Sequence, residues 1–172
     1  SASQEPPSMQ RASVGMLAVS EPDRRLDGGR DQRQAYLDYA RAFGSADFES
    51  FGSYYTKDAI CDLHGVVLRT REGIVAHYRE MFETVRESLT LHRLIADDAG
   101  FTAEVTSQFT AVHDAPTFYV APLRKGECIR VRTFVRYALH DGKISHVKVG
   151  PATQFSVLSS LEAARPDEPQ RG

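Results

Sequence analysis

The residues of this sequence best suited to chemistry are a carboxylate and an imidazole placed two positions apart. Asp62 and His64 belong to a short apolar segment that runs from Ala59 to Gly65. Burial in such a segment disfavours the charged form of a carboxyl group and raises its pKa. Side chains two positions apart on a strand share a face, so both can point into one cavity. We therefore predict that Asp62 is a general base that takes a proton next to a carbonyl group, with His64 as a second acid or base.

Two tyrosines could serve the same reaction. An enolate oxygen needs hydrogen-bond donors, and Tyr39 and Tyr78 could supply them, one directly and one from behind. Each of these interpretations has an alternative. Asp62 could face a turn or form a salt bridge near a helix end. The two tyrosines could be core residues whose buried hydroxyl groups have hydrogen-bond partners and no catalytic role.

Three amphipathic helices are predicted around this segment. Residues 31–43 carry one apolar face, with Tyr36, Leu37, Ala40 and Phe43 at helical spacing. A second helix follows Asp47, a residue type that caps helix N-termini, and it ends at residues 56–58. A third follows Thr70 and ends near Glu87. Residues 59–63 form a short strand between the second and third helices.

The second half of the chain alternates apolar and polar residues with the period of a β-strand. We predict strands at 89–96, 101–113, 127–140 and 144–149, with a possible strand at 117–121. Helices separated from an antiparallel sheet define an α+β domain. We expect three helices packed on a strongly curved antiparallel sheet, a cone-shaped, cystatin-like roll that encloses a pocket. The expected divisions are a flexible segment 1–30, a domain 31–155 and a flexible tail 156–172.

Composition excludes several classes of function. The chain has 172 residues, a net charge of −2 and 41% hydrophobic residues, which gives no polybasic footprint for nucleic acid or anionic membranes. No apolar run approaches the length of a membrane span, so we expect a soluble, cytoplasmic protein. Cys61 and Cys128 are predicted to be buried, reduced thiols. The other histidines lie at spacings unlike those of metal ligands, so we predict no metal.

Four stretches resemble the nuclear-transport-factor-2-like superfamily, in particular SnoaL-like polyketide cyclases and ketosteroid isomerases. The segments 39–47, 54–65 and 73–78 are similar to the three helices and the catalytic strand of an isomerase, and 136–144 is similar to its final hairpin. The resemblance covers roughly residues 31–154. It implies a proton-shuttling acid at Asp62, an oxyanion donor at Tyr39 and a supporting tyrosine at Tyr78.

The second oxyanion donor of the isomerases departs from the pattern. In that family it is a carboxylic acid held neutral, whereas its position here falls near Thr133. A threonine hydroxyl is a weaker acid, which argues against steroid isomerisation specifically. Residues expected to contact the substrate are Tyr55, Phe43, Phe109, Thr133 and Tyr137.

Two functions follow from this reasoning. The first is a cofactor-independent isomerase, cyclase or dehydratase that acts on a hydrophobic carbonyl compound such as a polyketide or terpenoid. The second is a non-catalytic module of the same fold that binds a small molecule or dimerises. Cavity volume distinguishes them, because an apolar ligand needs a void of roughly 300 Å3 or more. Arg130, Arg132 and Arg136 alternate on the outer sheet face, which we expect to be a homodimer surface.

Overall fold

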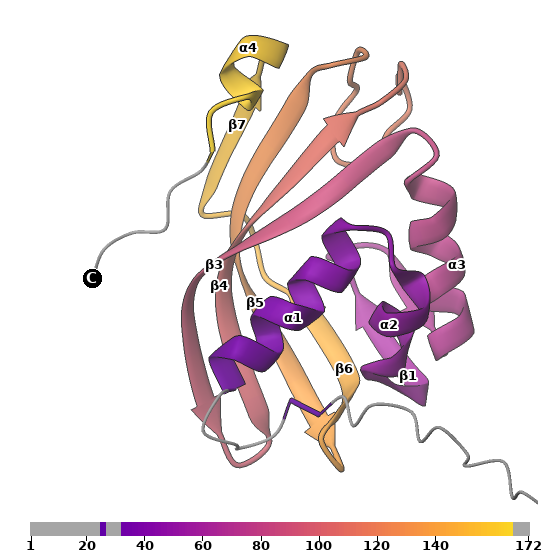
Figure 1. Ribbon diagram of the computed structural model, residues 1–172, viewed down its shortest axis with the longest axis vertical. Coiled ribbons are helices and arrows are strands. Elements are labelled where there is room, and N and C mark those ends of the chain that lie inside the picture. Colours follow the sequence, from indigo (N-terminus) through magenta and orange to yellow (C-terminus); the bar gives the residue numbers. More distant parts are fainter. Residues whose placement is uncertain (1–24, 27–31, 167–172) are drawn as a thin grey trace, which may run out of the picture.

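The computed structural model describes residues 25–26 and 32–166. They form the predicted α+β domain, in which helices pack against one sheet (Figure 1). The helices are α1 (Gln32–Gly44), α2 (Phe48–Ser53), α3 (Arg71–Met81) and α4 (Ser160–Ala163). The strands are β1 (Tyr55–Asp62), β2 (Val67–Arg69), β3 (Val85–Asp97), β4 (Gly100–Ala111), β5 (Cys128–His140), β6 (Lys143–Val149) and β7 (Gln154–Leu158).

Short polar side chains start the two helices that flank β1. A carboxylate oxygen of Asp47 accepts a hydrogen bond from the backbone N–H of Ser50 at 3.2 Å, and the Thr70 hydroxyl accepts one from Gly73 at 3.1 Å. Each bond satisfies a backbone donor that a helix N-terminus otherwise leaves unpaired. The predicted end of the third helix is wrong, because α3 stops at Met81 and β3 begins at Val85. Residue 87 therefore lies on a strand.

The sheet is mixed, whereas we had expected it to be antiparallel throughout. Its strand order is β2-β1-β6-β5-β4-β3, and β7 pairs with β5 beside this path. The β1–β6 pair is parallel, with Cys61 opposite Val147. The sheet is also not strongly curled, so the cavity described below lies between sheet and helices and not inside a cone.

Other boundaries also differ from those predicted. α2 ends at Ser53 and β1 begins at Tyr55, so the second helix is shorter and the first strand longer than expected. Residues 117–121 form no strand, and only an isolated bridge between Ala115 and Leu123 orders that loop. Instead of a flexible tail from residue 156, β7 pairs with β5 from Gln154 to Leu158, and α4 follows it. Figure 1 shows this C-terminal segment at the end of the sheet away from the β5–β6 hairpin.

The core is built from aromatic rings of α1 that pack on the sheet. Tyr36 contacts the rings of Phe101 and Tyr137 edge to face, with centroids 5.7 and 5.6 Å apart. Gly100, at the start of β4, has φ +154°, and a Cβ there would lie 2.0 Å from the Tyr137 carbonyl oxygen. Only glycine permits this close approach. Among the described helices none is long and apolar enough to cross a membrane.

One residue of the expected flexible N-terminal segment belongs to the domain. Leu26 is fully buried, and its backbone N–H donates to the Gly142 carbonyl oxygen at 2.9 Å. The side chain of Gln32 donates in turn to the Leu26 carbonyl oxygen at 2.8 Å. Residues 1–24 and 27–31 lie outside the described residues.

Truncation of this anchor should destabilise the domain. We expect Leu26→Ala to lower the free energy of unfolding by about 2–4 kcal/mol, since it removes a fully buried aliphatic side chain. Leu161→Ala is the matched control, because Leu161 is 84% exposed, and should change stability by less than about 0.5 kcal/mol. Urea unfolding followed by circular dichroism measures both. Equal effects of the two substitutions would contradict the anchoring role.

Candidate functional site

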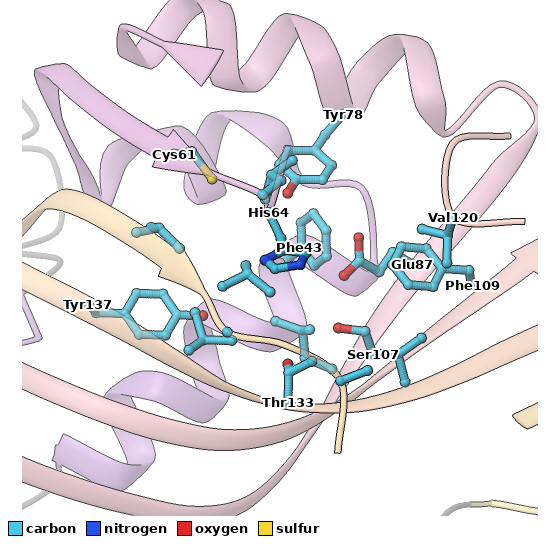
Figure 2. A pocket seen from close by; sticks show the side chains of 18 of the residues that line it. Phe43, Cys61, His64, Tyr78, Glu87, Ser107, Phe109, Val120, Thr133 and Tyr137 are labelled. Atoms are coloured by element: carbon cyan, nitrogen blue, oxygen red, sulfur yellow. The ribbon is translucent and has the colours of Figure 1, made fainter. Parts of the chain in front are cut away.

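A cavity of about 290 Å3 lies between the helices and the inner face of the sheet. This volume is close to the lower end of the range of roughly 300–1,000 Å3 for small-molecule sites. Side chains from α1, α2, α3 and from every long strand line it (Figure 2). Aromatic and aliphatic groups dominate the lining. The site is therefore shaped for a small hydrophobic molecule.

Most of the predicted site residues meet at this cavity, although their functional roles stay predictions. Tyr39 and Phe43 reach it from α1, Tyr55 from the start of β1 and Tyr78 from α3. The sheet supplies the rest of the predicted substrate contacts. The predicted residues that line the cavity are Tyr39, Phe43, Tyr55, His64, Tyr78, Phe109, Thr133 and Tyr137.

The predicted base, Asp62, does not line the cavity. Strand alternation turns its neighbour Cys61 inward, where Cys61 pairs with the cavity-lining Val147. Asp62 pairs with the exposed Lys148. Its carboxylate instead accepts a hydrogen bond from the backbone N–H of His64 at 3.1 Å. Such Asx geometry shapes a turn, which is the alternative that the sequence had left open.

His64 does not share the orientation of Asp62, because β1 ends between them. His64 has φ 57°, a left-handed conformation that breaks the strand's alternation. Its ring turns into the cavity (Figure 2), while the residue as a whole is exposed. His64 therefore lies at the mouth of the site, together with Tyr119, which is 44% exposed and also lines the cavity.

The carboxyl group inside the cavity is that of Glu87, which sequence reasoning missed. Glu87 is 8% exposed and points into the site beside Ser107 (Figure 2). Burial raises the pKa of its carboxyl group to about 8, against a smaller lowering by a hydrogen bond from the Ser107 hydroxyl. A carboxyl group that titrates near neutral pH can take up or release protons under physiological conditions.

A sequence signal for Glu87 did exist. Val85, Glu87, Leu89 and Leu91 alternate on one face of β3, and a carboxylate on an otherwise apolar face is unusual. The expected helix end near residue 87 hid this pattern. Pairing confirms the inward face, because Glu87 lies opposite the buried Phe109.

Hydroxyl groups on the other side of the cavity form close pairs. The Tyr39 and Tyr55 hydroxyl oxygens lie 2.6 Å apart, and those of Tyr36 and Tyr137 lie 3.0 Å apart. Burial holds the pKa of Tyr39, Tyr55 and Tyr137 well above the usual range, so these groups stay protonated. In each pair one hydroxyl donates to the other, and the accepting hydroxyl keeps a hydrogen that it can donate elsewhere.

The thiol at the cavity wall is not activated. Burial raises the pKa of Cys61 to about 12, although Tyr78 donates a hydrogen bond to its sulfur. Nucleophilic cysteines need a lowered pKa. Cys61 and Cys128 are both buried and free. Within the described part of the chain, no group of three or more His, Cys, Asp or Glu side chains could hold a metal ion.

These features define a pocket-bearing α+β domain with one ionisable carboxyl group at its centre. Residues 36–147 match the SnoaL-like domain family. The chain therefore belongs to this family, as the resemblance had predicted. A search of curated proteins finds no match.

Solved structures with the same fold cover several activities. A putative polyketide cyclase from Pseudomonas putida KT2440 is 22% identical with TM-score 0.58, covering 67% of this chain and 87% of its own. An LEH-like epoxide hydrolase from Mycobacterium tuberculosis is 16% identical with TM-score 0.55, covering 67% and 78%. The Δ5-3-ketosteroid isomerase from Mycobacterium sp. is 14% identical with TM-score 0.56, covering 73% and 97%. At these identities the likeness shows the fold alone.

Other structures of this fold hold small ligands. A protein from Catenulispora acidiphila binds trimethylamine, and one from Mycobacterium tuberculosis binds estradiol-17beta-hemisuccinate. Both are 12% identical to this chain, with TM-score 0.52; they cover 69% and 68% of it and 85% and 90% of their own chains.

The buried carboxyl group should make stability depend on pH. A carboxyl group whose folded pKa lies above its unfolded value costs stability as pH rises from about 4.5 to about 8. Glu87→Gln mimics the protonated form, so it should be neutral near pH 5. It should stabilise the domain by on the order of 1–4 kcal/mol at pH 9. Chemical unfolding at both pH values measures the difference. An equal effect at the two pH values would show that Glu87 titrates normally.

Proposed function

We propose that this domain is an acid–base catalyst, an isomerase, cyclase or dehydratase, that acts on a hydrophobic carbonyl compound. The observation that carries the proposal is the Glu87 carboxyl group inside an apolar cavity, with its pKa raised to about 8. Proton transfer is most efficient when the pKa of the catalytic group lies near the working pH. Glu87 thereby takes the place that the sequence had given to Asp62.

The proposed chemistry begins with proton abstraction. The ionised Glu87 takes a proton from the carbon next to a carbonyl group. The C–H electron pair forms a carbon–carbon double bond, and the π electrons of the carbonyl group move to its oxygen to give an enolate. The protonated Glu87 then returns the proton to another carbon or to a leaving oxygen. At pH 7 about a tenth of the molecules carry the ionised form. Ser107 holds the carboxyl group in place through its hydrogen bond.

The tyrosine pair supports the enolate. Tyr39 and Tyr55 both line the cavity, and their hydroxyl groups are hydrogen-bonded to each other at 2.6 Å. A donor whose oxygen already accepts a hydrogen bond is a stronger donor, because bonds in a chain polarise one another. Such a preorganised donor stabilises negative charge as it develops on the substrate oxygen. This role for Tyr39 is the one that the resemblance implied, with Tyr78 behind it.

The residues that line the cavity favour a hydrophobic substrate. Phe43, Phe109 and Tyr137 supply apolar contact, as expected of substrate-binding residues. Thr133 offers a hydroxyl group on the same wall. His64 at the mouth keeps the role of a second acid or base in this proposal. Relatives described as a cyclase and a ketosteroid isomerase support this class of substrate.

A binding module without turnover is the second candidate. Its support is that the cavity hydroxyls of Tyr39 and Tyr55 are hydrogen-bonded to each other, and that structures of this fold include ligand complexes. Homodimerisation through the outer sheet face remains a proposal. The arginines on that face pair within the sheet, Arg132 with Glu104 at 3.2 Å and Arg136 with Asp97 at 2.9 Å.

Deuterium exchange tests the catalytic proposal. Ketones with hydrogens next to the carbonyl group, both alicyclic and aromatic, are incubated with the protein in D2O and analysed by mass spectrometry. We expect exchange that is faster than in buffer and at least about 100-fold slower with Glu87→Gln, in line with loss of a general base. The rate should rise with pH and level off above about 8, because only the ionised carboxylate accepts a proton.

Two substitutions serve as controls for this assay. Glu83→Gln removes an exposed carboxylate close in sequence and should leave the exchange rate unchanged. Asp62→Asn separates the two candidate bases, and it should retain exchange if Glu87 is the base. Loss of exchange in Asp62→Asn with retention in Glu87→Gln would reverse the assignment. Binding of ketones without any exchange would favour the binding module.

Removal of the donor should slow the reaction without unfolding the protein. Tyr39→Phe is expected to lower kcat/KM by about 10- to 100-fold, because one preorganised donor to the oxyanion is lost. Tyr36→Phe is the matched control, since it also removes one buried hydroxyl from a tyrosine pair, yet Tyr36 is absent from the cavity lining. Equal losses of activity at matched stability would rule out a specific role for Tyr39.

A further inference from the structure

The cavity contains one acidic side chain and no basic one that could neutralise it from within. Among the described residues that line it there is no lysine and no arginine. The imidazole of His64 lies at the exposed mouth. Within the described part of the chain, Glu87 forms no ion pair. An ionised Glu87 would thus be a buried charge without a partner, which is strongly unfavourable.

Aromatic rings surround the same carboxyl group. Phe43 and Phe109 lie on either side of Glu87 in Figure 2, and Tyr78 lies above it. The Phe43 and Tyr78 rings pack edge to face with centroids 4.9 Å apart, and Phe43 packs on Phe51 at 5.0 Å. Faces of such rings carry negative electrostatic potential and attract cations. A carboxylate among aromatic rings is a site that favours a desolvated positive charge.

We propose that this cavity binds a small lipophilic cation, an alkylammonium ion, with the charged nitrogen beside Glu87 and the alkyl groups against the surrounding rings. The cation supplies the partner that the ionised carboxylate lacks. The cavity volume of about 290 Å3 accommodates an ammonium group with three or four short substituents. The carboxyl proton is released to solvent when the cation binds, so that the bound pair is neutral overall.

The groups that face Glu87 add no competing positive charge in the interior. They come from the elements packed around it, and burial raises the pKa of the phenols and of the thiol, so these groups stay uncharged at neutral pH. They are Cys61 of β1, Tyr78 of α3, Ser107 of β4, Tyr119 of the loop after β4, and, at the mouth, His64 after β1.

This arrangement fixes the direction of the pH dependence. Below the pKa of Glu87, about 8, binding requires loss of a proton, so affinity for a permanent cation should rise about tenfold per pH unit. Above it the carboxylate is already ionised, and affinity should level off. A neutral ligand of the same shape should show the opposite preference or none.

The inference goes beyond catalysis and stands apart from it. It requires the position and burial of Glu87, and it requires no turnover. Failure of the ketone exchange assay would leave cation binding intact, and failure of cation binding would leave the proton-transfer proposal untouched.

Isothermal titration calorimetry with a matched pair of ligands tests the proposal. Choline and 3,3-dimethylbutan-1-ol have the same shape, and only choline is charged; benzyltrimethylammonium serves as a larger cation. At pH 8.5 we expect at least one cation to bind ten or more times tighter than the neutral alcohol. Its Kd should increase about tenfold from pH 7 to pH 6, with proton release that shows as a dependence of the heat on the buffer.

Three variants complete the test. Glu87→Gln should abolish the preference for the cation and its pH dependence, whereas Glu83→Gln should change neither. His64→Gln should keep both, which separates the carboxyl group from the imidazole at the mouth. The proposal is overturned if neither cation binds better than the alcohol at pH 8.5, or if the preference persists in Glu87→Gln. It is also overturned if Kd is independent of pH in the wild-type protein, a measurement that needs no variant to fold.

Discussion

The desolvation of one carboxyl group, that of Glu87, sets the chemistry that this cavity can support. An ionised carboxylate in an apolar site loses its hydration, and one hydrogen bond from Ser107 replaces only part of it. The protonated form is therefore favoured up to a pH of about 8. Because the cost of ionisation is present before any ligand arrives, a ligand that relieves it gains affinity, and a substrate that gives a proton to the carboxylate gains reactivity.

Such a carboxyl group can exist only where the fold keeps a cavity open beside a close-packed core. Protein interiors otherwise pack to the density of organic crystals. Here the rings of α1 and α2 pack on one another and on the sheet, as in the stacked pair Tyr39–Phe51 at 5.6 Å and the edge-to-face pair Tyr36–Tyr137 at 5.6 Å. α1 contacts β3, and the packed rings leave a space between the helices and the inner face of the sheet. That space is the pocket.

The position of the carboxyl group has a cost in stability. A glutamate at an inward position of a strand destabilises the fold at any pH at which its carboxyl group is ionised. An apolar side chain at the same position would not have this cost. A buried ionisable residue with a raised pKa is commonly functional, since an apolar side chain would serve a purely structural role with less loss of stability. The comparisons do not identify that function, because the structural neighbours share the fold but differ in activity.

The sequence by itself determined the class of fold, the family and most of the cavity lining. Apolar residues recur at helical spacing in residues 32–44 and at every second position in β4 and β5. Each pattern gathers apolar side chains on one face of its element, and that face is the one that becomes buried. This is why the sequence could place Tyr39, Phe43, Phe109 and Tyr137 on buried faces that line the cavity, while their functional roles stay predictions. The Asp-Gly turn and the capping residues Asp47 and Thr70 likewise act through local geometry, which a sequence displays.

Only the tertiary structure decided which carboxylate enters the pocket. Asp62 and Glu87 both stand near the end of an element, where a shift of one residue reverses the direction of a side chain. The parallel pairing of β1 with β6 turned Cys61 inward and Asp62 outward, and the early end of α3 placed Glu87 on β3. These outcomes depend on pairing between segments more than 20 residues apart in the chain. The alternation of residues 85–91 marks Glu87 as an unusual carboxylate on an apolar face, but only this pairing shows that it enters the pocket. Local patterns do not decide such pairing.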